Sequence, residues 1–97
     1  MPTYVTLVNF TDQGIRNFKD TPKRARAFMD LAEQMGGKVK DIYWTLGPYD
    51  IVVITEAPDD ETATAAALMN ASLGNVRTTT LRGFDIKEIE TIINKTD

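Results

Sequence analysis

The segment YWTLGPYDIVVITE, from Tyr43 to Glu56, decides the fold because it holds two strands and the turn between them. Gly47 can adopt a positive φ and Pro48 restricts φ, so this pair predicts a two-residue type II′ hairpin. The run Ile51–Ile54 is continuously apolar, which is typical of a central strand covered on both faces. Asp50 borders this run, and its carboxylate therefore needs a partner or access to water.

The composition excludes several classes of protein. The chain has 97 residues, a net charge of −3 and 42% hydrophobic residues, which indicates one globular domain over residues 1–97. The absence of cysteine and histidine removes disulfides, thiolate chemistry and the commonest haem and transition-metal ligands. We therefore expect no cofactor and no metal. Because the net charge is negative, basic and aromatic residues do not alternate, and no long apolar run occurs, we expect a cytoplasmic protein without nucleic-acid or membrane partners.

The rest of the chain adds two strands and three helices, and the segment Ile15–Asp20 reads as a helical turn or an irregular loop. The expected order predicts a ferredoxin-like α+β fold, a four-stranded antiparallel sheet of strand order 4-1-3-2 with a short C-terminal helix. The predicted elements are a strand over Tyr4–Phe10, a helix from Thr21 to Met35, strands over Val39–Leu46 and Tyr49–Glu56, a helix over Thr62–Leu73, an edge strand over Val76–Phe84, and a helix capped by Asp85 and Glu88.

The start of the first long helix combines a clear signal with an unusual one. Thr21 is expected to cap the helix through its hydroxyl, with Pro22 at the first helical position. Cations follow at once, although the helix dipole favours anions there. They indicate a nearby anion or acidic partner, or they are solvated or paired with Asp20 and Asp30. These cations are Lys23, Arg24 and Arg26.

The topology also predicts assembly. Both long helices should cover the same face of the sheet, while several strands carry apolar side chains on the other face. One short C-terminal helix is too small to cover that face. Because large bare apolar patches are rare on soluble monomers, we expect a second copy to stack sheet against sheet. The result would be a homodimeric α/β barrel, which can assemble further.

Three segments far apart in the sequence should meet at one end of this sheet. They are Thr11–Gly14 after the first strand, the Gly47–Pro48 hairpin, and Ser72–Asn75 after the second long helix. Aromatic walls with a few polar groups are typical of small-molecule pockets. The candidate site residues at this end are Asp12, Gln13, Arg16, Trp44, Tyr49, Asp50, Asn75 and Arg77.

Asp50 and Tyr49 are the candidate catalytic residues. Asp50 is a candidate general base, and Tyr49 can donate its hydroxyl to a ligand or to a developing oxyanion. The alternative for Asp50 is structural, either capping the hairpin or pairing with Arg16 or Arg77. Tyr49 has a similar alternative, a hydrogen bond at the end of the sheet.

The other candidates are ligand-binding residues, and structural roles are the alternative for them. Arg16 and Arg77 can hold a carboxylate or phosphate bidentately. Asp12 with Gln13 can contact a polar ligand or simply form a turn, and Asn75 lies near them. A metal held by Asp12 and Asp50 would have oxygen ligands only, as Mg²⁺ or Ca²⁺ prefer.

Two aromatic residues, Tyr43 and Trp44, point to opposite faces of their strand because side chains alternate along a strand. One should face the helices and the other the barrel interior or dimer interface. Either residue can contact a ligand or pack in the core or interface.

Three motifs resemble the GYD-domain family, small bacterial and archaeal proteins of the dimeric α/β-barrel superfamily. They are TDQGIR at Thr11–Arg16, YWTLGPYD at Tyr43–Asp50 and GNVR at Gly74–Arg77, and the resemblance runs roughly from Tyr4 to Phe84. It implies the fold and dimerisation but not an activity. Proteins of the same barrel shape include cofactor-free monooxygenases, isomerases, haem enzymes and amino-acid-sensing modules. The absence of histidine argues against the haem branch.

Three functions remain open on the sequence. The first is a homo-oligomer that binds a small molecule as a sensor or carrier. The second is a cofactor-independent isomerase or monooxygenase acting on a small aromatic or keto compound. In the third, the motif residues serve folding and assembly only.

Overall fold

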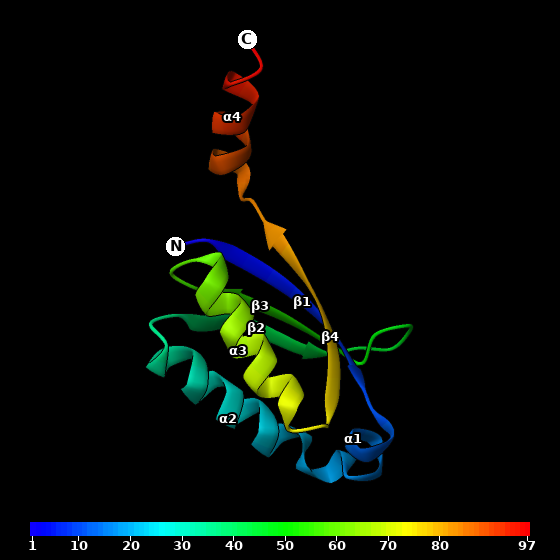
Figure 1. The fold of residues 1–97 in the computed structure, drawn as a ribbon. Helices are drawn as coiled ribbons and strands as arrows, with labels where there is room; N and C mark the ends of the chain where they lie inside the picture. Colours follow the sequence, from blue (N-terminus) through cyan, green and yellow to red (C-terminus); the bar gives the residue numbers. More distant parts are fainter.

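The computed structural model describes all 97 residues and contains four strands, four α-helices and one 3-10 helix (Figure 1). In chain order they are β1 (Thr3–Phe10), α1 (Asp12–Arg16), η1 (Phe18–Asp20), α2 (Thr21–Gln34), β2 (Lys38–Trp44), β3 (Ile51–Glu56), α3 (Asp60–Ser72), β4 (Val76–Gly83) and α4 (Ile86–Asn94). This is the predicted ferredoxin-like order, and the uncertain segment before α2 is helical.

The four strands form one antiparallel sheet in the order β2-β3-β1-β4, so the predicted strand order is confirmed. β3 lies between β2 and β1, as its apolar sequence indicates, and β4 is an edge strand. The register places Val8 opposite Ile51 on one side and Thr78 on the other.

One face of the sheet is covered by α2 and α3, which run across it side by side in Figure 1. The buried core on this face consists of Val8, Ile51, Val53 and Val76, whose side chains share a face by strand alternation. Partly buried Phe10, Phe28, Val39 and Ile42 pack against them. The helix-covered face of the sheet is therefore the only face that carries a buried hydrophobic core.

The opposite face has no covering element within the chain. Strand alternation and the register put Val5, Leu7, Tyr43, Val52, Ile54 and Leu81 on this side, which we call the open face. Tyr43 is 60% exposed and Leu81 49%, whereas Ile51 and Val53 on the covered face are only 7% and 5% exposed. Within the chain, the Ile51–Ile54 run is thus covered on one face, and cover on the other face depends on the predicted second copy.

The hairpin differs from the predicted two-residue turn. β2 ends at Trp44 and β3 begins at Ile51, which leaves a six-residue loop. Gly47 does adopt a positive φ, +116°. The loop is longer because Thr45 closes it, donating its N–H to the Asp50 carbonyl at 2.9 Å and its hydroxyl to the Tyr49 carbonyl at 2.6 Å.

The start of α2 also differs from the prediction. The 3-10 helix η1 runs directly into α2, so Thr21 lies inside the first turn and its hydroxyl accepts a hydrogen bond from Trp44 Nε1 at 3.1 Å. Arg24 donates to the carbonyls of Gly14 and Asn17 at 3.2 and 3.0 Å. The only two salt bridges join Lys40 to Glu56 and Arg82 to Glu88, so the basic residues of α2 make no pair with Asp20 or Asp30.

A clasp between Thr11–Gly14 and Leu73–Asn75 joins the end of β1 to the end of α3. Thr11 donates its N–H to the Asn75 carbonyl at 3.1 Å and its hydroxyl to the Gly74 carbonyl at 2.6 Å. Gly14 is buried against this segment, and a Cβ there would lie 1.9 Å from the Asn75 carbonyl oxygen. The clasp therefore requires glycine at position 14.

Substitution Gly14→Ala should lower the free energy of unfolding by at least about 1–3 kcal/mol, because the new methyl group would displace backbone. Urea denaturation followed by circular dichroism measures this change. Gly83→Ala is the matched control, since a Cβ there meets its neighbours at ordinary contact distances of 3.6 Å and more. Equal stability of the two variants would contradict the clasp.

Candidate functional site

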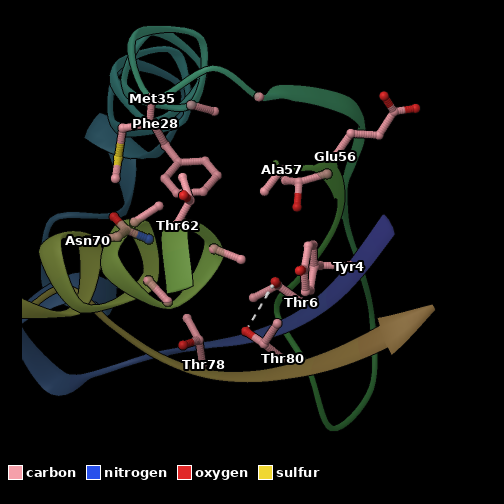
Figure 2. A pocket seen from close by; sticks show the side chains of 16 residues that line it. Tyr4, Thr6, Phe28, Met35, Glu56, Ala57, Thr62, Asn70, Thr78 and Thr80 are labelled. Atoms are coloured by element: carbon pink, nitrogen blue, oxygen red, sulfur yellow. Dashed lines mark hydrogen bonds between the residues drawn. The ribbon is translucent and has the colours of Figure 1, made fainter. Parts of the chain in front are cut away.

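A small cavity lies between the sheet and the two long helices. It has a volume of about 40 Å³ and is bordered by side chains of α2, α3, β1 and β4. In Figure 2, Phe28 of α2 and Met35, which directly follows α2, point in, while Thr78 and Thr80 approach from β4. The residues that line it are Tyr4, Thr6, Phe28, Ala32, Met35, Gly37, Thr55, Glu56, Ala57, Thr62, Ala63, Ala66, Ala67, Asn70, Thr78 and Thr80.

The space exists because small side chains face one another across the layer. α3 contributes alanines at positions 63, 66 and 67, which let the helix lie close to the sheet but leave little bulk in between. The facing strands present threonines, and the hydroxyls of Thr6 and Thr80 lie 3.3 Å apart. The lining is thus mainly apolar with a few hydroxyl groups.

The cavity adjoins a wider groove on the surface, of about 340 Å³. The groove shares Tyr4, Ala63, Ala67 and Thr80 with the cavity. Its other lining residues are Asp60, Thr64 and Arg82. We call the cavity and groove together the Tyr4 site.

Tyr4 is the central polar residue of this site. Its ring is almost fully buried, at 4% exposure, and its hydroxyl donates to Asp60 Oδ1 at 2.5 Å. The guanidinium of Arg82 lies 5.7 Å from the centre of the Tyr4 ring, within the range of a cation–π contact. The groove beside the apolar cavity is therefore lined by a phenol, a carboxylate and a guanidinium.

The surroundings keep Tyr4 in its neutral form. Burial, followed by the hydrogen bond to Asp60 and the negative charge of that carboxylate, raises the pKa of Tyr4 from 10.0 to about 12. The positive charge of Arg82 acts in the opposite direction but is the smaller effect. Tyr4 is consequently a hydrogen-bond donor at neutral pH rather than a base or nucleophile.

The dimensions of the Tyr4 site suit a small ligand. Ligand pockets in proteins commonly measure about 300–1,000 Å³, and the groove falls at the lower end of that range. The inner cavity has room for only a few atoms, such as a short apolar group. The geometry can bind and orient a molecule that has one apolar end and one polar end.

At the predicted site, the structure brings together the residues of the clasp. Gln13 Nε2 donates to Asn75 Oδ1 at 3.0 Å and to the Leu73 carbonyl at 3.1 Å. Asp12 lies exposed in the first turn of α1. Gln13 and Asn75 are thus engaged with one another across the junction of α1 and α3.

Asp50 is held by the backbone of β1. Its Oδ2 accepts a hydrogen bond from the Phe10 N–H at 2.8 Å, and its own N–H donates to the Val8 carbonyl at 2.8 Å. No salt bridge connects it to Arg16 or Arg77. The carboxylate therefore continues the β1–β3 pairing beyond the end of the ladder.

The remaining predicted residues are dispersed. Arg16 is exposed at the end of α1, and Arg77 is exposed on β4, opposite Asn9 on the side of the open face. Tyr49 is half-buried and its carbonyl accepts from Thr45. Trp44 lies toward α2, where its indole donates to Thr21, while Tyr43 lies on the open face. The two aromatic residues do point to opposite faces, as predicted.

Sequence reasoning missed Tyr4, Asp60 and Arg82 as site residues. Tyr4 reads as an ordinary core residue of the first strand, and Asp60 reads as a helix-start acid. The signal that was available is the alanine-rich helix facing a threonine-rich edge strand, because two runs of small side chains leave space between the layers.

No group of three or more potential metal-ligating side chains occurs. None of the helices combines the length and the hydrophobicity that crossing a bilayer requires.

Comparison with known proteins agrees with the resemblance of the three sequence motifs to the GYD-domain family. A sequence model of the GYD domain matches residues 4–93. A protein of Thermus thermophilus, named glutamine synthetase and cystathionine beta-lyase binding protein, is 36% identical over 90 residues, covering 92% of this chain and 95% of that protein.

Two solved structures have a similar fold. The crystal structure of TTHA0845 from Thermus thermophilus has a TM-score of 0.56 at 25% identity and covers 88% of this chain and 95% of its own. The structure of MtbAldR (Rv2779c) has a TM-score of 0.59 at 18% identity, covering 87% of this chain and 52% of that one. The second likeness supports the ferredoxin-like fold alone.

Substitution Tyr4→Phe should remove the hydrogen bond to Asp60 and lower the free energy of unfolding at neutral pH by about 1 kcal/mol. The pH dependence gives a sharper test. Because folding raises the pKa of Tyr4, the folded state binds this proton more tightly than the unfolded state does. The resulting stabilisation is complete below pH 10 and is lost as the pH rises toward about 12.

The stability difference between the wild type and Tyr4→Phe should therefore shrink across this alkaline range. Parallel thermal denaturation of both proteins at several pH values measures it, and tyrosinate absorbance in the wild type should include a late step that the variant lacks. A stability difference that stays constant from pH 10 to 12 would contradict the assigned environment of Tyr4.

Proposed function

Since the chain belongs to the GYD domain family, we propose that it is a homodimeric binding protein, a sensor or carrier whose small ligand occupies the Tyr4 site. The observation that carries this proposal is that an apolar cavity and a polar groove lie side by side and share Tyr4 in their linings. A ligand could place a short apolar group in the cavity and its polar end near Asp60 and Arg82.

The polar groups of the groove favour binding over chemistry. Tyr4 has a raised pKa and remains a donor, and Asp60 already accepts its hydrogen. The alternative, a cofactor-independent isomerase or monooxygenase, would use Asp50 as base with Tyr49 or Arg77 as oxyanion donor. Asp50 uses one carboxylate oxygen to accept from the Phe10 N–H, which is an arrangement that serves folding. The third alternative is a purely structural or assembly role, which would assign no function to the Tyr4 site.

Homodimerisation through the open face is part of this proposal. The face carries apolar side chains on all four strands and has no cover within the chain. A second sheet packed against it would bury them, as in other two-layer sheet packings. The cytoplasmic location expected from the composition belongs to the same proposal.

A second candidate function is binding to a partner enzyme. It is favoured by the relative that is 36% identical and is named for binding glutamine synthetase and cystathionine beta-lyase. Both functions are compatible in one molecule, because the Tyr4 site occupies the helix-covered half of the fold and leaves other surfaces free.

Filling the groove should abolish ligand binding without unfolding the protein. Ala67 lines both cavity and groove and is half-buried, so Ala67→Phe would project a ring into the site. Leu68→Phe is the matched control, because Leu68 is 67% exposed and lines neither space. A panel of small carboxylates, amines and aromatic acids is screened by thermal shift, and hits are measured by calorimetry.

A ligand that stabilises the wild type and the Leu68→Phe variant but not Ala67→Phe would support the proposal. A hit that stabilises all three proteins equally would place binding elsewhere. A wild type that responds to no compound of a broad panel would remove the support for a sensor or carrier function.

Charge introduced into the open face should dissociate the dimer. Val52 lies near the middle of this face, opposite Leu7 and Tyr43, so Val52→Glu would bury a carboxylate in the interface. Sedimentation equilibrium should report a monomer, or a dimer weakened by at least about a hundredfold. Leu46→Glu is the control, since Leu46 is fully exposed in the hairpin loop. Unchanged dimer mass for Val52→Glu would contradict the interface.

A further inference from the structure

The C-terminal helix α4 has an apolar side that nothing in the chain covers. Figure 1 shows α4 standing beyond the end of β4, clear of the sheet and of the other helices. Phe84, just before it, is 51% exposed. The apolar stripe of the helix is exposed over its whole length: Ile86 76%, Ile89 42%, Ile92 37% and Ile93 57%.

The helix itself is well defined at its start. Asp85 and Glu88 form a complete capping box, with Glu88 N donating to Asp85 Oδ1 at 2.8 Å and Asp85 N to Glu88 Oε1 at 3.1 Å. Arg82 fixes the joint to β4, since its guanidinium lies 3.6 Å from Glu88 Oε2 and 4.5 Å from the centre of the Phe84 ring. The direction in which α4 leaves the sheet is therefore set by specific contacts.

An isolated helix of nine residues is not stable in water, so α4 requires a surface to pack on. The chain offers an apolar groove of about 370 Å³ beside Met29, Ile42 and Trp44, but α4 cannot reach it. That groove flanks β2, whereas α4 follows β4, and these are the two opposite edges of the sheet. Trp44 also lies at the end of the sheet opposite to Gly83, which pairs with Thr3.

The size of the open face points to the occupant. Four strands of this length present a flat area of roughly 20 Å by 20 Å, or about 400 Å². A stable interface of standard size buries about 800 Å² on each partner. A flat contact of this size is smaller than a standard interface, and α4 is an uncovered apolar element that directly follows the edge strand β4.

We infer that α4 is an exchanged arm, whose isoleucine stripe packs on a second copy of this chain and completes the sheet-to-sheet dimer. This inference rests on the proposed homodimer and adds a second contact to it. Each protomer contributes one arm, so a two-fold dimer contains the contact twice. Packing on the second copy would give α4 the surface that a nine-residue helix needs.

The test replaces two residues of the stripe in the full chain. The double variant Ile89→Glu/Ile93→Glu should raise the dimer dissociation constant at least about tenfold, because it puts charge where apolar contacts form. Thr91→Glu is the matched control on the polar side of the same helix, and it should change the constant less than about twofold. Sedimentation equilibrium gives the constants, and circular dichroism verifies that each variant is folded.

The outcomes separate this inference from the dimer it rests on. If Val52→Glu dissociates the protein but the double variant dimerises like the wild type, the arm is wrong and the sheet interface stands. If the wild type is monomeric at all concentrations, both proposals are wrong. Weakening by the double variant but not by Thr91→Glu supports the arm.

Cross-linking tests whether α4 contacts a second copy or its own chain, independently of the dimer affinity. A photoreactive benzoylphenylalanine replaces Ile93 in an equal mixture of ¹⁴N- and ¹⁵N-labelled chains. Cross-linked peptides that combine both isotopes would show that α4 reaches a second copy. Cross-links made only within one isotope would show that the helix folds back on its own chain, which would overturn the inference.

Discussion

The structure depends on the pairing of β1 with β3 at the centre of the sheet and on its coverage from one side only. Val8, Ile51 and Val53 bury their side chains under α2 and α3, while Leu7 and Val52 in the same strands face away from both helices. Because side chains alternate, every strand that builds the core also builds the open face. The clasp at Gly14 and the Asp50 carboxylate hold the same strands at their ends.

Because only one face of the sheet is covered, its two faces offer different binding surfaces. The covered face is packed with small residues near its edge, where α3 alanines meet β4 threonines, and this leaves the space of the Tyr4 site. Tyr4 connects the covered layer with the groove, because its ring is part of that layer and its hydroxyl binds Asp60 in the groove. Arg82 lies at the border, in contact with the Tyr4 ring on one side and with α4 on the other. A ligand at this site would therefore lie beside the joint of the C-terminal helix.

The strand order, the one-sided helices and the capped C-terminal helix follow from local sequence patterns, so they could be predicted. The hairpin length could not, because it depends on the Thr45 and Asp50 hydrogen bonds rather than on Gly47 alone. Likewise Thr21 binds Trp44 instead of capping α2, a contact between residues far apart in sequence. The Tyr4 site escaped prediction for a related reason: a cavity is defined by what several elements leave empty, whereas sequence motifs mark side chains that are present. Motif reading found the clasp residues Gln13 and Asn75, which the structure does bring together.

Native mass spectrometry of the protein purified from the organism that encodes it tests the central claim most directly. A homodimeric binding protein should appear at twice the mass of the 10.8 kDa chain, with part of the population carrying a small adduct that is lost on collisional activation. Fragmentation of that adduct would give the chemistry of the ligand. A monomer free of adduct at every protein concentration would contradict both the open-face dimer and the occupation of the Tyr4 site.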